Sequence, residues 1–218
     1  MSMKFDAVIF DMDGTLLNTL DDLADSVNAM LEGRGYPLRT KEEVRGFVGN
    51  GVHALIALSL PDGRENPAFE ECLADFIERY KKNLQNKTAP YPGIPELLER
   101  LDLLGMKLGV VSNKFDSAVK KINQLYFGNR IPVAVGESEN MRKKPAPDSV
   151  YAALAEMDAH PGRTLYVGDS EVDVQTAKNA GLPCVGVTWG FRNREVLERE
   201  GADWIINKPE ELMDILEK

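Results

Sequence analysis

The chain has 218 residues, of which 43% are hydrophobic and 28% are charged, as is usual for a globular protein. Its 26 basic and 35 acidic residues give a net charge of −9, which argues against nucleic acid and anionic membranes as partners, because both bind a basic surface. No apolar segment approaches the roughly 20 residues of a membrane-spanning helix, and Cys72 and Cys184 fit no disulfide or metal-binding pattern. We therefore expect a cytoplasmic protein.

A short apolar run at residues 7–10 predicts a strand buried on both faces, because its apolar residues do not alternate with polar ones. Further runs of this kind occupy residues 108–111, 131–135, 164–167, 183–187 and 204–206. Pro132 favours an edge position for the second of these. Helical periodicity separates the runs, at residues 94–104, 117–126, 149–157, 172–180 and 210–216. The alternation predicts an α/β fold with a doubly wound, Rossmann-like parallel sheet, which binds ligands beyond the carboxyl ends of its strands.

Residues 17–87 interrupt this alternation. They show helical periodicity at residues 20–31, 52–60 and 69–84, and no buried strand. The proline-rich stretch at residues 89–93 then returns the chain to the α/β pattern. We therefore expect two domains: an α/β core of residues 1–16 and 88–218, and an inserted all-helical cap of residues 17–87.

Two aspartates, Asp11 and Asp13, directly follow the first predicted strand. Gly14 permits a turn that lets both carboxylates face the strand end. One carboxylate could attack phosphorus and form an aspartyl phosphate, and the other could act as general acid and then as general base. Taken alone, the Asp-x-Asp-Gly sequence is equally consistent with an ordinary turn.

A second acidic pair, Asp169 and Asp173, lies at the end of a later strand and one turn into the following helix. Carboxylate oxygens close to Asp11 would suit Mg²⁺. Acidic residues at a helix N-terminus also cap the helix and interact with its dipole, and Asp173 could do both.

Clustered carboxylates and a phosphate need positive charge nearby. Lys144 is a candidate because Pro145 holds it in an extended conformation, although it could also be a solvated lysine beside Lys143. Ser112 follows a strand and could donate to a phosphate oxygen, with Asn113 as an orienting neighbour. A serine at that place is more often a simple cap.

Together these residues resemble the haloacid dehalogenase-like hydrolases, whose four motifs occur here in order over nearly the whole chain. The matching segments are residues 10–16, 111–114, 144–148 and 168–173. The resemblance implies that Asp11 is the nucleophile and that Asp13 is the general acid and base. It implies Ser112 and Lys144 as two further catalytic residues. It implies Mg²⁺ held by the Asp11 side chain, the Asp13 main-chain carbonyl and Asp169, with Asp173 as a further candidate. Thr15 and Asn113 are expected to contact substrate.

Family members that dehalogenate lack the second aspartate, so Asp13 favours phosphate-ester chemistry. Residues 47–52 resemble the cap loop of the family's phosphoglycolate phosphatases, and residues 144–148 and 186–190 are also similar to that group.

Four residues of the predicted cap are candidates for substrate contact. Gly49 and Gly51 would let the backbone approach a ligand, and Asn50 could hydrogen-bond it. Arg45 could pair with a substrate carboxylate. Alternatively, residues 49–51 could simply form a tight turn between two helices, and Arg45 could be a solvated surface residue.

We therefore predict a Mg²⁺-dependent phosphatase that hydrolyses a small phosphorylated metabolite through an aspartyl-phosphate intermediate, with 2-phosphoglycolate as the leading substrate. The alternatives within the family are a sugar-phosphate phosphatase, a phosphoglucomutase-like enzyme and a pyrophosphatase. An alternative of another class is a non-catalytic protein that binds a phosphometabolite. None of these features indicates the oligomeric state.

Overall fold

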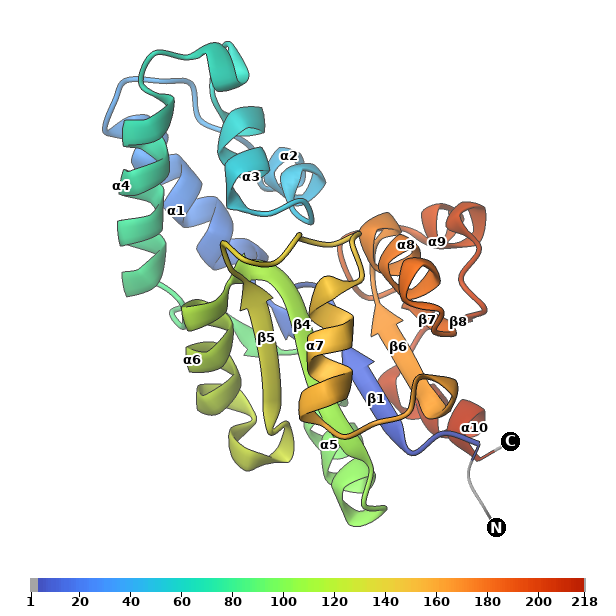
Figure 1. Cartoon of the computed structure of the whole chain (residues 1–218). Helices are drawn as coiled ribbons and strands as arrows, with labels where there is room; N and C mark the ends of the chain where they lie inside the picture. Colours follow the sequence, from blue (N-terminus) through green and yellow to red (C-terminus); the bar gives the residue numbers. More distant parts are fainter. Residues whose placement is uncertain (1–3, 218) are drawn as a thin grey trace. The chain divides into compact units, whose positions relative to one another are not determined.

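The structure is a computed structural model that describes residues 4–217 (Figure 1). Contacts between residues divide it into two compact units. Unit 1 comprises residues 4–17 and 90–217, and unit 2 comprises residues 18–89. Among residues 4–217, no helix is both long and apolar enough to cross a lipid bilayer.

Unit 1 is built on a six-stranded sheet in the order β5-β4-β1-β6-β7-β8, and every neighbouring pair of strands is parallel. The strands are β1 (Ala7–Phe10), β4 (Lys107–Phe115), β5 (Val133–Glu137), β6 (Thr164–Gly168), β7 (Cys184–Val187) and β8 (Trp204–Ile206). Each overlaps one of the predicted apolar runs, and β5 lies at an edge as Pro132 predicts. The predicted doubly wound parallel α/β architecture is confirmed.

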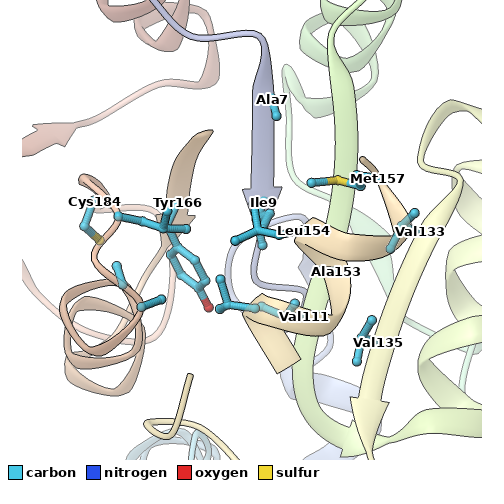
Figure 2. Close-up of a cluster of buried hydrophobic side chains, with 14 of the residues drawn as sticks. Ala7, Ile9, Val111, Val133, Val135, Ala153, Leu154, Met157, Tyr166 and Cys184 are labelled. Carbon is cyan, nitrogen blue, oxygen red and sulfur yellow. The ribbon is translucent and has the colours of Figure 1, made fainter. Parts of the chain in front are cut away.

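Both faces of the sheet are buried, which explains why its strands do not alternate between apolar and polar residues. Ala7 and Ile9 belong to a core cluster with residues of α7 (Asp148–Glu156) and α8 (Glu171–Ala180) (Figure 2). Val8 and Phe10 point to the opposite face, because successive side chains of a strand alternate, and they are buried as well.

Unit 1 contains four further α-helices and three one-turn 3-10 helices. These are α5 (Ile94–Leu103), α6 (Asp116–Tyr126), α9 (Arg194–Glu200) and α10 (Leu212–Leu216), with η2 (Gly128–Arg130), η3 (Pro161–Arg163) and η4 (Pro209–Glu211). The apolar pattern does not predict α9, because its sequence is mostly charged and Leu197 is its one buried residue. Its ends carry local signals instead: the Asn193 side chain caps the Val196 amide at 3.2 Å, and Gly201 has a φ of 74°.

Unit 2 is helical. It contains α1 (Leu20–Glu32), α2 (Lys41–Phe47), α3 (Val52–Ser59), η1 (Gly63–Glu65) and α4 (Phe69–Lys82). Periodicity does not predict α2, since Val44 is its one buried residue. The signal for α2 is a capping box, in which Thr40 and Glu43 each accept a hydrogen bond from the other's backbone amide, at 3.2 and 2.8 Å.

Two short strands, β2 (Leu17–Asn18) and β3 (Ala89–Pro90), pair where the chain passes between the units. The buried Asp22 carboxylate ties the two ends of unit 2 together, because it accepts hydrogen bonds from the Lys87 amide at 3.0 Å and the Thr88 amide at 2.9 Å. These bonds replace the hydration that the carboxylate loses on burial.

Candidate active site

The carboxyl ends of three central strands bring the predicted site residues of unit 1 together. Phe10 of β1 is level with Val110 of β4 and Val167 of β6, so the residues that follow emerge at one edge of the sheet. Asp11 follows β1, Ser112 lies in the last part of β4, and Asp169 follows β6. All three side chains are buried. The register of a parallel sheet therefore gathers residues that lie far apart in the sequence.

A bulge in β4 shapes the second part of the site. The β4–β5 register shifts between Val111 and Phe115, and such bulges re-aim side chains next to active sites. The Asn113 side chain there holds the Lys144 backbone from both sides: its amide nitrogen donates to the Lys144 carbonyl at 3.0 Å, and its oxygen accepts from the Lys144 amide at 2.8 Å. Asn113 thus positions Lys144.

Lys144 is buried and not solvated, with 3% of its side chain exposed. Its ammonium lies 2.6 Å from Asp11 Oδ1 and 2.8 Å from Asp173 Oδ1, and it donates to the Tyr166 hydroxyl at 3.2 Å. Burial alone would lower the pKa of Lys144, but the carboxylates of Asp11 and Asp173 raise it well above its usual value. Lys144 therefore stays positively charged beside Asp11.

Asp173 caps α8 and contacts the site at the same time. Its Oδ2 accepts hydrogen bonds from the Ser170 hydroxyl at 2.6 Å and the Ser170 amide at 3.1 Å, while its Oδ1 accepts from Lys144 and from the Tyr166 hydroxyl at 3.0 Å. Burial opposes the charged form, but Lys144 and these donors lower the pKa of Asp173 below its usual value. A carboxylate has about four lone-pair sites, so these four donors fill them.

Asp169 is held by a shell of backbone and small residues. Its Oδ1 accepts from the Thr15 hydroxyl at 3.1 Å and its Oδ2 from the Phe191 amide at 2.7 Å. Gly14, with a φ of 93°, and Gly190 pack directly on it: an added Cβ would lie 2.4 Å from Asp169 Oδ2 and 2.3 Å from Asp169 Cβ, respectively. Any side chain at either glycine would therefore displace Asp169.

Three buried carboxylates form a group that could hold a metal ion. Ligand oxygens of Asp11, Asp169 and Asp173 lie within 4.8 Å of one another, and an all-oxygen donor set suits Mg²⁺ or Ca²⁺. Burial and the neighbouring Asp173 raise the pKa of Asp169 to about 7. Burial also raises the pKa of Asp11, which Lys144 offsets only in part. A bound cation would favour the ionised form of both, so the residues fit a divalent metal.

The Asp13 side chain contacts a second lysine. Lys114 Nζ lies 3.0 Å from Asp13 Oδ1, and 7% and 13% of the two side chains are exposed. Lys114 ends the second of the matching sequence segments, but sequence reasoning assigns it no role.

Tyr166 is another site residue that sequence reasoning misses, because it lies within an apolar run and is predicted to be core. Figure 2 shows it within the buried cluster, and its hydroxyl contacts both Lys144 and Asp173. A buried tyrosine hydroxyl needs a hydrogen-bond partner, so a tyrosine in a fully buried strand next to Asp169 is the signal that could identify it.

We expect Tyr166→Phe to lower kcat by about tenfold with little change in KM, because Lys144 and Asp173 lose a shared partner worth roughly 1–1.5 kcal/mol. Steady-state kinetics on the purified variant would measure this. Tyr151→Phe is a matched control, since Tyr151 is half-exposed and its hydroxyl bonds only weakly to the Asn179 carbonyl, at 3.4 Å. An unchanged kcat for Tyr166→Phe would show that the hydroxyl plays no part in positioning Lys144.

The remaining predicted substrate contacts lie in unit 2. Arg45 is in α2 and pairs with Glu42 at 3.3 Å. Gly49 and Gly51 have φ values of 124° and 81° in the turn between α2 and α3, and such values favour glycine. The turn thus explains both glycines, and contact of Arg45, Gly49, Asn50 and Gly51 with substrate stays a prediction.

Comparison with known proteins places the chain in a family. The family model described as haloacid dehalogenase-like hydrolase matches residues 8–187. Curated relatives include the N-acetylmuramic acid 6-phosphate phosphatase of Pseudomonas aeruginosa, 34% identical over 99% of this chain and 96% of the relative. A phosphoglycolate phosphatase of Chromobacterium violaceum is 32% identical over 96% of each chain.

Solved structures agree with this placement. A protein of Lactobacillus delbrueckii subsp. bulgaricus, provisionally named phosphoglycolate phosphatase, has a TM-score of 0.93 at 33% identity, covering 99% of this chain and 100% of its own. CbbY from Rhodobacter sphaeroides, solved in complex with phosphate, has a TM-score of 0.81 at 26% identity, covering 98% and 100%.

The chain belongs to the haloacid dehalogenase-like hydrolases. Within that family it is a phosphatase, a phosphoric monoester hydrolase, which confirms the class that Asp13 predicts.

Proposed function

We propose that the chain is a Mg²⁺-dependent phosphatase that cleaves a small phosphate monoester through an aspartyl phosphate on Asp11. The observation that supports this most strongly is the buried contact of Asp11 with Lys144, beside Asp169 and Asp173. A buried carboxylate that faces a lysine ammonium and two further acids costs stability, and such clusters of buried charged groups are concentrated at functional sites.

Each residue has a defined step in this proposal. A carboxylate oxygen of Asp11 attacks phosphorus, and the bond between phosphorus and the ester oxygen breaks. Asp13 gives the leaving oxygen a proton and later takes one from the water that attacks phosphorus, which releases phosphate and restores Asp11. Lys144 offsets charge near the transferring group. The Ser112 hydroxyl, which accepts from the Lys114 amide at 3.2 Å, can donate its own hydrogen to a phosphoryl oxygen.

The metal would be held by the side chains of Asp11 and Asp169 and by the Asp13 main-chain carbonyl. Each oxygen of Asp169 accepts one of the described hydrogen bonds, and one lone pair therefore remains on each. The four donors on Asp173 argue for an indirect role there, through Lys144. Bound Mg²⁺ would offset the charge of the phosphoryl oxygens.

Unit 2 is proposed to act as a cap whose residues, Arg45 and Gly49–Gly51 among them, contact the organic part of the substrate. Closure of such a cap would exclude water and complete the site. The proposal rests on the helical unit 2 and on the sequence similarity of its α2–α3 turn to phosphoglycolate phosphatases.

We propose 2-phosphoglycolate as the leading substrate, because several curated relatives at about one-third identity are named phosphoglycolate phosphatase. N-acetylmuramic acid 6-phosphate is the second candidate, since a relative with that activity is 34% identical over 99% of this chain. A sugar phosphate is a further candidate substrate, because the chain is similar to CbbY, a mutant of which has been solved in complex with xylulose-(1,5)bisphosphate. A non-catalytic binding role fits less well, because Asp11 and Asp13 are both retained.

Phosphate release tests this proposal. The purified protein should hydrolyse 2-phosphoglycolate faster than N-acetylmuramic acid 6-phosphate, glucose 1-phosphate, nucleoside monophosphates and pyrophosphate. EDTA should abolish release, and added Mg²⁺ should restore it. A low rank for 2-phosphoglycolate would remove that substrate alone, whereas activity that survives EDTA would contradict the metal requirement. Saturable binding without phosphate release from any compound would favour the binding protein.

A further inference from the structure

Lys114 and Asp13 form a second lysine–aspartate pair beside the one between Lys144 and Asp11. The Nζ–Oδ1 distance is 3.0 Å, and both side chains are mostly but not fully buried. Asp11 and Asp13 thus each pair with a different lysine. Lys144 serves the proposed nucleophile, while Lys114 is next to the proposed proton donor of the leaving group.

The backbone of Lys114 is fixed by its surroundings. It lies in the β4 bulge, where its amide donates to Ser112 Oγ at 3.2 Å. Its carbonyl lies against Gly136 of β5, where an added Cβ would come within 2.7 Å of the Lys114 oxygen. A residue held on both sides at a bulge aims its side chain in a defined direction.

Stability is a poor explanation for this pair. A lysine and an aspartate lose most of their hydration on burial, and an ion pair in such a place often stabilises no better than apolar residues of similar size. Its position beside Asp13, at the edge of the sheet where the proposed chemistry occurs, points instead to a role in handling the substrate.

We propose that Lys114 recognises an anionic group on the leaving alcohol, on the carbon bonded to the ester oxygen, and so selects phosphate esters of 2-hydroxy acids. This rests on the proposed function, in which Asp13 protonates the leaving oxygen. For that step an oxygen of Asp13 must come within about 2.6–3.2 Å of the leaving oxygen. Where that oxygen is Oδ1, the Lys114 ammonium, which is 3.0 Å from Oδ1, lies within about 6 Å of the leaving oxygen.

A carboxylate on the carbon bonded to the ester oxygen lies close enough for the Lys114 ammonium to contact it, whereas a carboxylate on the far side of a sugar ring does not. The lysine ammonium has three N–H donors on a flexible stem, so it can contact Asp13 and a substrate oxygen together. Lys114 is therefore a specificity-determining residue as well as a partner of Asp13.

The test compares 2-phosphoglycolate with its neutral amide, the phosphate ester of glycolamide, which has the same carbon skeleton. The wild-type protein should favour the acid in kcat/KM by about tenfold to a hundredfold, the effect of one charge-assisted hydrogen bond. Lys114→Met should remove most of this preference, and Lys114→Arg should retain part of it. Lys121→Met is the control, because it removes an exposed lysine of α6 and should leave the preference unchanged.

Three outcomes would count against the proposal. Equal loss of activity on both substrates in Lys114→Met would reduce Lys114 to a residue that only positions Asp13. A wild-type protein without preference for the acid would overturn the proposal with no variant needed, which matters if Lys114→Met fails to fold. Absence of phosphate release from any ester would instead overturn the proposed function, and this inference with it.

Discussion

Asp11→Asn should lower kcat by at least about 10⁴-fold, because removal of a catalytic nucleophile costs most of the rate enhancement of an enzyme. Asparagine keeps the size of the side chain but cannot form an acyl phosphate. The variant should remain folded, because burial and the neighbouring Asp173 and Asp169 disfavour the charged form of Asp11, and Lys144 keeps its contact with Asp173 at 2.8 Å. Initial rates of phosphate release from 2-phosphoglycolate would measure the effect.

Asp214→Asn is a suitable control for this variant, because Asp214 is an exposed residue of α10. It should retain wild-type activity. Appreciable activity in a folded Asp11→Asn protein would rule out Asp11 as the nucleophile.

Lys144→Met should cost both activity and stability. It leaves Asp11 and Asp173 buried without the ammonium that lies 2.6 and 2.8 Å from them. Loss of one partner from a buried pair typically costs about 3–5 kcal/mol, and loss of a charged group at the reacting centre costs about 10²–10³-fold in kcat. Urea unfolding and steady-state kinetics would measure the two effects.

A second substitution separates these two effects. Asp173→Asn in the Lys144→Met background removes one of the two unpaired carboxylates, so it should recover part of the lost stability without restoring kcat. Lys143→Met provides the control, because Lys143 is the exposed neighbour in the sequence. If Lys144→Met keeps wild-type stability and kcat, Lys144 has neither the structural nor the catalytic role assigned to it.

The central strands and the residues that follow them could be predicted because they follow local rules. Strands buried on both faces read as continuous apolar runs, and β1, β4 and β6 do so. Ligand sites of parallel sheets lie beyond the strand ends, and Asp11 and Asp169 stand there. The sequence therefore predicts both the architecture and the place of the site.

Other features depend on contacts that no local pattern encodes. The sequence leaves two interpretations of Lys144, and contacts with Asp11, at a separation of 133 residues, show that it is buried. The partners of Tyr166 and Lys114 likewise lie outside their strands: Tyr166 contacts Lys144 in a loop and Asp173 in α8, and Lys114 contacts Asp13 in the loop after β1. Apolar periodicity does not predict the helices α2 and α9 for a different reason. Each buries a single residue, so the signals for these helices are their capping residues.

Identifying the phosphorylated residue would test the proposed aspartyl phosphate most directly. The protein would be mixed with 2-phosphoglycolate, quenched in acid within one turnover, and digested for mass spectrometry. We expect a hydroxylamine-sensitive phosphoryl group on the peptide that contains Asp11 in the wild-type protein, and none in Asp11→Asn, which cannot form an acyl phosphate. A phosphoryl group on another residue, or wild-type turnover without any phosphoprotein, would contradict the role of Asp11 as nucleophile.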